Sequence, residues 1–264
     1  YIINTCSVTE NADQKAQRLV RKIKNKSPDS CVAIIGCYAQ LQTEKIAQMP
    51  GVDIVLGAHD KFNLPEYIEA YHNSNQKILS ETNIKELDKF IPSYSLDERT
   101  RSFVKVQDGC DYNCSFCTIP LARGKSRSST IRNMLPVIEK ISNSDTKEIV
   151  LSGINLGDFG INNGESLIDL LEIIESMNGI ERCRISSIEP NLLSDDIIKF
   201  ISESKKVLPH LHIPLQSGSD KILQLMRRRY DTDLYRTKIK KINNMIPNCC
   251  IGVDVIVGFP SESE

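Results

Sequence analysis

The sequence predicts an α/β protein whose parallel strands are covered by helices. Short apolar runs rich in β-branched residues alternate with amphipathic segments at helical spacing, and this alternation is typical of strand–helix–strand units. The chain has 264 residues, of which 40% are hydrophobic and 25% are charged. That composition excludes a mainly disordered or collagen-like chain and provides ample material for a core. No apolar run approaches the roughly 20 residues that a membrane helix needs.

The first α/β unit is expected over residues 1–72. Its first helix begins at about Asn11 and ends before the turn-forming stretch Ser27–Asp29. The apolar residues that fall on one face of this helix are Ala12, Ala16, Leu19, Val20 and Ile23. Strands are expected at Tyr1–Ile3, Cys31–Ile35 and Val52–Leu56, with further helices near Thr43–Gln48 and after Asn63. This order predicts a parallel sheet covered by helices.

A polar linker is expected over 73–98, with one short strand near Lys77–Glu81, and the second unit over 99–264. The strands of the second unit are expected at Phe103–Gln107, Glu148–Ser152, Arg182–Ser187, His210–Pro214 and Cys250–Val257. Its helices are expected at Thr130–Ser142, Leu167–Met177, Asp195–Glu203 and Asp233–Met245. Five strands alternating with helices fit either a (β/α) barrel or an open doubly wound sheet.

The strongest chemical signal is a loop of three cysteines directly after the expected strand Phe103–Gln107. Cys110, Cys114 and Cys117 are separated by three and two residues. Thiolates suit iron–sulfur clusters or zinc. Three ligands leave one iron of a cubane cluster open to a substrate, whereas a zinc site needs a distant fourth ligand. The chain has nine cysteines and no visible signal peptide, which argues against a disulfide framework and for metal or redox chemistry.

A second pair of cysteines follows two strands of the first unit. Cys6 and Cys37 come directly after their strands, so both are expected at the ligand-binding edge of the parallel sheet, whereas Cys31 starts its strand at the opposite edge. The pair indicates either a cluster that needs at least one more ligand or two buried free thiols. The residues alone favour neither.

The other expected strands of the second unit also end in glycine or small polar residues. A polar cofactor would need such a rim at the carboxyl ends of barrel strands. The segments concerned are Gly153–Gly157, Ser186–Pro190, Leu215–Ser219 and Gly258–Pro260. Cys183, Cys249 and Cys250 fall at strand starts and are interpreted as small core residues.

The Cys110–Cys117 loop resembles the CxxxCxxC motif of the radical S-adenosylmethionine superfamily. The resemblance implies a TIM-like partial barrel and a [4Fe-4S] cluster on Cys110, Cys114 and Cys117. It implies that the open iron chelates S-adenosylmethionine, and that one electron from the cluster cleaves this cofactor to a 5′-deoxyadenosyl radical. Phe116 is expected near the adenine, with a plain core aromatic as the alternative. Further contacts with the cofactor are expected around Gly153, Ser187, Glu189 and Gln216.

Within that superfamily the chain resembles the methylthiotransferases. Asn4-Thr5-Cys6 and Gly36-Cys37-Tyr38-Ala39-Gln40 carry this resemblance together with the cysteine loop. It implies a Rossmann-like first domain that binds a second, auxiliary [4Fe-4S] cluster through three cysteines, of which Cys6 and Cys37 match two. The third ligand is expected upstream of Tyr1, and a final barrel strand and a small RNA-binding domain are expected beyond Glu264. The chain is therefore expected to be a fragment of a longer protein.

The segments Asn4–Thr9, Gly36–Gln40 and Ile119–Ser128 look most like the bacterial branch that acts on threonylcarbamoyladenosine in tRNA. The resemblance implies methylthiolation of C2 of that nucleoside at position 37 of the anticodon loop, in the cytoplasm and without a membrane. It implies an electron donor such as flavodoxin or ferredoxin, leaves the sulfur donor unidentified and assigns no side chain as a catalytic base. The alternatives are methylthiolation of N6-isopentenyladenosine or of a ribosomal protein aspartate, or a zinc-stabilised RNA-binding module without catalysis.

A local basic cluster supports an RNA substrate, although the formal net charge of the chain is only −1. Four basic residues just beyond the cysteine loop are expected to contact RNA phosphates, namely Arg123, Lys125, Arg127 and Arg132. A second cluster, Arg227–Arg229 followed by Tyr230, fits either base stacking and phosphate contacts or a solvated helix face.

Overall fold

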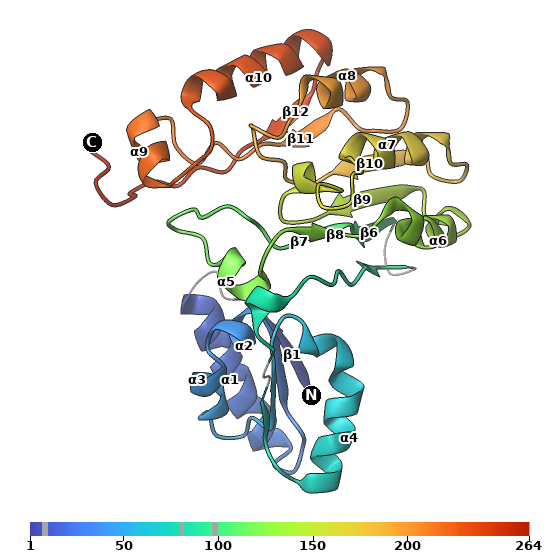
Figure 1. The fold of residues 1–264 in the computed structure, drawn as a ribbon. Coiled ribbons are helices and arrows are strands. Elements are labelled where there is room, and N and C mark those ends of the chain that lie inside the picture. Colours follow the sequence, from blue (N-terminus) through green and yellow to red (C-terminus); the bar gives the residue numbers. More distant parts are fainter. Residues whose placement is uncertain (7–9, 80–81, 97–99, 264) are drawn as a thin grey trace. The chain divides into compact units, whose positions relative to one another are not determined.

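In a computed structural model of the protein, the described residues are 1–6, 10–79, 82–96 and 100–263. They form two compact units, of which one comprises Tyr1–Leu87 and Cys117–Lys125 and the other comprises Asp88–Phe116 and Ser126–Glu264. Figure 1 shows the elements of both units. The chain therefore passes between the units at 87/88, at 116/117 and at 125/126. This division differs from the expected boundaries of 1–72, 73–98 and 99–264, because the segment after the cysteine loop joins the first unit.

The first unit contains a four-stranded parallel sheet in the order β1-β2-β3-β4. Its strands are β1 (Ile2–Thr5), β2 (Ala33–Gly36), β3 (Ile54–Leu56) and β4 (Ile78–Leu79). Its helices are α1 (Glu10–Lys26), α2 (Cys37–Leu41), α3 (Thr43–Ala47), α4 (Leu64–Ser74) and α5 (Ile119–Arg123), with 3-10 turns at Asp60–Asn63 and Ile84–Glu86. The predicted α/β order is confirmed, while the short helices α2 and α5 escaped prediction.

Helices cover both faces of this sheet because its strands alternate between two apolar cores. Val32 and Ile34 belong to the core under α1, α2 and α3, whereas Ala33 and Ile35 belong to the core under α4. Of the residues expected on one face of α1, Ala16, Val20 and Ile23 are buried, whereas Leu19 is 44% exposed. The expected helix residue Ala12 and the motif residues Ser7–Thr9 lie outside the side chains that the structure describes.

The second unit contains the five predicted parallel strands in chain order. They are β6 (Arg101–Lys105), β9 (Glu148–Ser152), β10 (Arg182–Ile185), β11 (His210–His212) and β12 (Cys250–Gly252). Strand β9 lies between β6 and β10 and pairs with both, and β11 pairs with β12. A bridge between Ser187 and His212 joins the two sets. A short antiparallel strand, β5 (Ser93–Tyr94), borders β6, and β7 (Gln107–Asp108) pairs with β8 (Arg127–Ser128).

All helices that connect these strands pack into one core. Their bounds are α6 (Ile131–Ser142), α7 (Leu167–Ser176), α8 (Asp195–Glu203), α9 (Asp220–Leu225) and α10 (Thr232–Met245), with a 3-10 turn at Leu156–Asp158. Strand residues of one parity, such as Ile149, Leu151 and Ile185, share that core with Ile138 and Ile198 of the helices. Helices on one face of a parallel sheet are the arrangement of a barrel, not of a doubly wound sheet. The predicted partial barrel is confirmed.

The three cysteines interpreted as small core residues differ in burial. Cys183 of β10 is fully buried, as expected for a small core residue. Burial raises the pKa of its thiol to about 12. Cys250 is exposed and Cys249 is half-buried. The core interpretation of Cys250 was therefore wrong, because the first residue of β12 does not point into the apolar core.

Candidate iron–sulfur and cofactor site

Two cysteines of the first unit lie at the same edge of its sheet. Strands β1 and β2 are in a register that sets Thr5 beside Gly36, and Cys6 and Cys37 directly follow these residues. Cys6 is exposed, whereas Cys37 is buried at the start of α2. Gly36 has a φ of +102°, and a Cβ there would lie 2.5 Å from the carbonyl oxygen of Thr5. Glycine therefore permits the close approach of the two strand ends.

Helix α5, which follows the cysteine loop in sequence, packs against α2 in the same unit. Its last residue, Arg123, is half-buried and donates a hydrogen bond from Nε to the sulfur of Cys37 over 3.4 Å. Gly124 ends α5 with a φ of +76°, and a Cβ there would lie 2.6 Å from the carbonyl oxygen of Ile84. Arg123 was predicted to contact RNA, and in the structure its guanidinium faces a cysteine.

The first two cysteines of the loop belong to the second unit and follow β6 and β7, at the carboxyl end of the first barrel strand. The sulfur of Cys110 accepts a hydrogen bond from the backbone N–H of Tyr112 over 3.4 Å. The buried sulfur of Cys114 accepts one from the guanidinium of Arg228 over 3.1 Å. Cys117 is half-buried and belongs to the first unit. The sulfurs of Cys110 and Cys114 thus each accept a hydrogen bond from an N–H group, as the sulfurs of cluster ligands commonly do.

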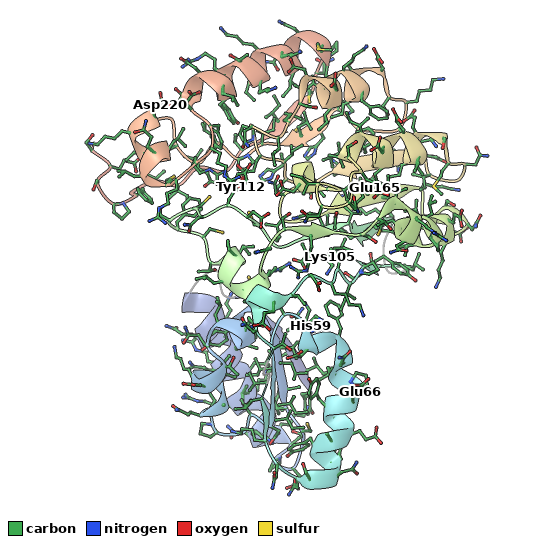
Figure 2. All side chains as sticks on the ribbon, viewed as in Figure 1. His59, Glu66, Lys105, Tyr112, Glu165 and Asp220 are labelled. Atoms are coloured by element: carbon green, nitrogen blue, oxygen red, sulfur yellow. The ribbon has the colours of Figure 1, made fainter. Side chains whose placement is uncertain are left out.

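The loop between Cys110 and Phe116 is anchored to other parts of the second unit. Ser115 donates from its backbone to Met226 over 3.1 Å and from its hydroxyl to the carbonyl of Leu225 over 3.0 Å. The backbone N–H of Ser126 donates to the carboxylate of Asp111 over 3.0 Å. Tyr112, labelled in Figure 2, is buried and accepts a hydrogen bond from Asn191 over 2.6 Å. These contacts anchor the loop to the rest of the second unit.

Gln107 joins the base of the cysteine loop to the next barrel loop, and sequence reasoning missed it. Its side chain is fully buried. The amide nitrogen donates to the carbonyl of Gly109 over 2.8 Å, and the amide oxygen accepts from the backbone N–H of Ile154 over 2.8 Å and of Asn155 over 3.0 Å. A Cβ on Gly153 would lie 2.9 Å from this oxygen. The one signal in the sequence was a polar residue at the end of an expected strand, three residues before the first cysteine of the loop.

The residues predicted to contact S-adenosylmethionine all lie in the second unit, at or just beyond the carboxyl ends of barrel strands. Phe116 leaves 38% of its surface exposed, so it is not a core aromatic. The hydroxyl of Ser187 lies 2.6 Å from Nδ1 of His212. Gln216 has a φ of +64°, and its backbone bonds to Asp254 over 2.8 Å. The backbone N–H and carbonyl of Gln216 are therefore both paired within the second unit, with Asp254 and Ile256, whereas Ser187 and Glu189 carry side-chain oxygens.

Glu189 forms a buried ion pair with Arg228, which sequence reasoning assigned to a basic surface run. Burial raises the pKa of Glu189, and the charge of Arg228 opposes that rise. Burial also disfavours the charged form of Arg228, but the Glu189 carboxylate outweighs it and raises the pKa of Arg228. Tyr230 is buried too, so it cannot stack on a base. No sequence pattern separated Arg228 from its exposed neighbours Arg227 and Arg229.

The four residues predicted to bind RNA do not share one environment. Lys125 and Arg132 are exposed, and Arg123 is half-buried. Arg127 is only 8% exposed, lies 3.7 Å from the carboxylate of Asp108 and donates to the carbonyl of Lys89. This burial corrects the prediction for Arg127, because β8 turns its side chain into the protein.

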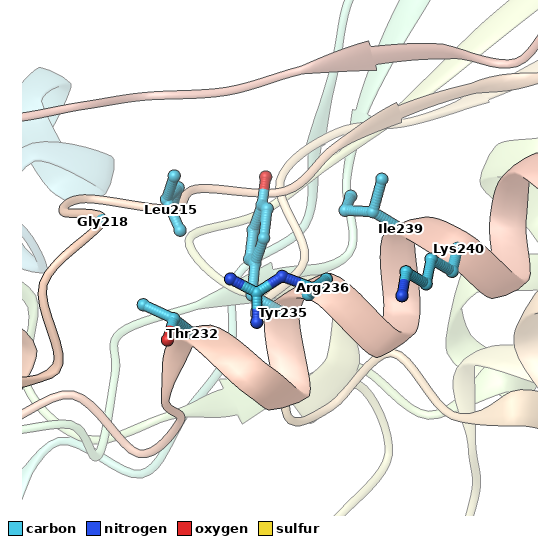
Figure 3. A pocket seen from close by; sticks show the side chains of 7 residues that line it. All are labelled: Leu215, Gly218, Thr232, Tyr235, Arg236, Ile239 and Lys240. Atoms are coloured by element: carbon cyan, nitrogen blue, oxygen red, sulfur yellow. The ribbon is translucent and has the colours of Figure 1, made fainter.

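A cavity of about 320 Å³ lies elsewhere in the second unit, between the loop after β11 and helix α10 (Figure 3). It is lined by Leu215, Gly218, Thr232, Tyr235, Arg236, Ile239 and Lys240. None of the predicted site residues lines it. In the parts of the chain that the structure describes, no three or more His, Cys, Asp or Glu side chains are grouped to hold one metal ion. Over the same residues, no helix combines the length and apolar character needed to cross a membrane.

The sequence of this chain matches two family profiles and several characterised relatives. The radical SAM superfamily profile matches residues 104–264, and the profile of the uncharacterized protein family UPF0004 matches residues 1–57. The threonylcarbamoyladenosine tRNA methylthiotransferases MtaB of Bacillus subtilis and Thermotoga maritima are 38% and 37% identical over 100% of this chain. A tRNA-2-methylthio-N(6)-dimethylallyladenosine synthase of Clostridium botulinum is 36% identical over 100% of this chain. The chain spans 59–60% of the length of these relatives.

Solved structures share the fold. The radical S-adenosylmethionine methyltransferase TsrM from Kitasatospora setae aligns with a TM-score of 0.70 at 10% identity, over 99% of this chain and 57% of that chain. The cobalamin-dependent S-adenosylmethionine radical enzyme OxsB aligns with a TM-score of 0.65 at 12% identity, over 97% of this chain and 40% of that chain. The superfamily profile covers more than half of the chain, and the cysteine loop lies within it. The chain belongs to the radical SAM superfamily.

Proposed function

We propose that this chain is part of a tRNA methylthiotransferase that modifies C2 of N6-threonylcarbamoyladenosine at position 37 of the anticodon loop. The observation that carries the proposal is the cysteine loop at the carboxyl end of β6, in which Cys110 and Cys114 each receive an N–H donor. The substrate follows from the names of the relatives that are 38% and 37% identical. Cytoplasmic location follows from a tRNA substrate.

Cys110, Cys114 and Cys117 would hold the [4Fe-4S] cluster that the superfamily implies. The thiol donors, the spacing of the motif and the hydrogen bonds to two of the sulfurs fit such a cluster. When bound, the cluster and S-adenosylmethionine together supply a radical that can remove a hydrogen atom from an unactivated C–H bond. The protein's part is to hold the ligands and shield the site, which is why no side chain need act as a general base.

The cofactor would lie over the strand ends that carry Phe116, Gly153, Ser187, Glu189 and Gln216. Gly153 lacks a Cβ where Gln107 and Leu156 pack closely, so glycine lets the side chain of Gln107 join this strand end to the base of the cysteine loop. Ser187 is oriented by its contact with His212. The exposed ring of Phe116 offers an apolar face to an adenine.

Cys6 and Cys37 would hold the auxiliary [4Fe-4S] cluster, with a third ligand from elsewhere in the protein. Their position after the paired residues Thr5 and Gly36 supports this proposal, since both thiols start from adjacent strand ends. Lys125 and Arg132 are exposed and would contact RNA phosphates. A reduced flavodoxin or ferredoxin would supply electrons, and the source of the sulfur stays open.

A second substrate is N6-isopentenyladenosine at the same tRNA position. The Clostridium botulinum relative, which is 36% identical, favours it. Deletion of the gene, followed by mass spectrometry of tRNA nucleosides, separates the two. We expect loss of the 2-methylthio derivative of threonylcarbamoyladenosine. Loss of the 2-methylthio derivative of N6-isopentenyladenosine instead would assign the second substrate. Unchanged levels of both 2-methylthio nucleosides would contradict a tRNA methylthiotransferase.

Metal analysis of the anaerobically reconstituted protein tests the cluster. We expect iron and a broad visible absorption, because iron–sulfur clusters are coloured and d¹⁰ zinc is not. Zinc without visible absorption would favour the non-catalytic RNA-binding module.

A further inference from the structure

Arg228 is turned into the protein beside a cysteine of the cluster loop. It follows α9, where Arg227 has a φ of +59° and the backbone N–H of Arg228 donates to the carbonyl of Leu223 over 2.9 Å. This turn leaves the Arg228 side chain only 4% exposed. Its terminal nitrogen NH1 lies 3.1 Å from the sulfur of Cys114. A buried guanidinium that donates to a thiol is a specific contact, not a feature of a solvated basic run.

The guanidinium is held on its other sides as well. NH2 donates to the carboxylate of Glu189, and Nε donates to the hydroxyl of Tyr230 over 3.3 Å. The ring of Tyr230 lies under the guanidinium, 5.0 Å from ring centre to carbon. The Tyr230 hydroxyl donates in turn to the carbonyl of Pro214 over 2.8 Å. Because each edge of the planar guanidinium has a partner, the orientation of the N–H group that donates to Cys114 is fixed.

Such a donor affects a cluster thiolate in a defined way. A hydrogen bond and a positive charge both stabilise the more electron-rich, reduced cluster, and hydrogen bonds to cluster sulfurs are known to set the reduction potential. We propose that Arg228 is a positioning residue that holds the Cys114 thiolate and raises the reduction potential of the cluster, and that Glu189 fixes Arg228 in that position. This inference rests on the proposed cluster and gives Glu189 a role through Arg228.

The experiment compares reduction potentials of the reconstituted protein by redox titration with electron paramagnetic resonance. A Cys6→Ala/Cys37→Ala background leaves one cluster to titrate. In Arg228→Gln, reduction should become about tenfold less favourable, which is about 59 mV for a one-electron couple. Arg228→Lys keeps the charge but loses the fork, so a smaller shift is expected. Arg227→Gln, which removes an exposed neighbouring charge, is the matched control and should leave the potential unchanged.

Each outcome decides the proposal. An unchanged potential in a folded, iron-loaded Arg228→Gln protein overturns it, and so does an equal shift in Arg227→Gln. If circular dichroism shows that Arg228→Gln does not fold, the potential of Arg228→Lys decides in the same way. A folded Arg228→Gln protein that no longer takes up iron supports the positioning role. Absence of iron–sulfur absorption in the unmutated protein contradicts the proposed function itself, which is a distinct failure.

Discussion

Arg123 donates a hydrogen bond from its Nε to the sulfur of Cys37 over 3.4 Å, within one compact unit. The arginine comes from the segment after the cluster loop, whereas the cysteine begins α2, directly after a strand of the first unit's sheet. A residue expected at an RNA surface therefore contacts a proposed ligand of the auxiliary cluster. This contact and the one between Arg228 and Cys114 give one thiol of each proposed cluster an arginine donor.

Arg123→Gln should weaken iron binding at the auxiliary site by about tenfold, as expected when a partner of a metal ligand is lost. Iron per chain would be measured in a Cys110→Ala/Cys114→Ala/Cys117→Ala background of the whole protein. Lys125→Gln, an exposed change two residues away, should leave the iron content unchanged. An Arg123→Gln protein with normal iron content but weaker tRNA binding in a filter assay would restore the RNA role.

Gly153→Ala should destabilise the second unit by about 1–3 kcal/mol, the usual cost of overpacking. The new Cβ would lie 2.9 Å from the amide oxygen of Gln107 and 3.0 Å from a methyl carbon of Leu156. Urea unfolding measures the change. Gly218→Ala is the control, because no atom lies within 4 Å of a Cβ there, and its effect should stay within about 0.5 kcal/mol. Equal effects of the two variants would contradict this packing argument.

Stability should fall in acid partly because of Glu175. Burial acts to raise the pKa of Glu175, but hydrogen bonds from Ser204, Lys205 and Lys206 outweigh it and hold the pKa below its ordinary value of 4.5. Since the folded-state value is the lower one, the charged carboxylate stabilises the fold above about pH 4.5, and this contribution disappears as the pH falls through the folded-state value.

Glu175→Gln should therefore lower the free energy of unfolding at pH 7 and flatten its decline between pH 7 and about pH 3. Denaturant titrations at several pH values check this. Glu172→Gln, an exposed change on the same helix, serves as the control. An identical pH profile in Glu175→Gln and the unmutated protein would refute the assignment.

The cysteines outside the proposed clusters should differ in reactivity. Burial raises the pKa of Cys183 to about 12, so only about one thiol in 10⁴ is a thiolate at pH 8. Cys250 is exposed. Brief treatment with iodoacetamide at pH 8 should modify Cys250 and leave Cys183 unmodified until the protein is denatured, as peptide mass spectrometry would report. Early labelling of both would contradict the buried position of Cys183.

The periodic features of the sequence predicted most of the fold. Strand β9 and helix α8 have the predicted bounds, because alternation and helical spacing are local signals. The positions of Cys6, Cys37 and Cys110 after strands were equally predictable. The partners of these cysteines were not, because they depend on contacts across long stretches of chain.

Two arginines illustrate this limit. Arg127 and Arg228 both belong to basic runs that look solvated, yet both are turned inward. Strand β8 directs Arg127 toward Asp108, and the left-handed backbone at Arg227 directs Arg228 toward Glu189. A left-handed conformation at a residue other than glycine or asparagine leaves no mark in a sequence.

The membership of Cys117–Lys125 in the first unit bears on how this protein can be divided or recombined. A cut at 87/88 would sever the first unit from α5, although α5 packs on α2. Chimaeras between relatives should therefore take residues 1–87 and 117–125 from the same parent protein. The third cysteine of the cluster loop would then travel with the auxiliary-cluster ligands of one parent, while the first two would come from the other.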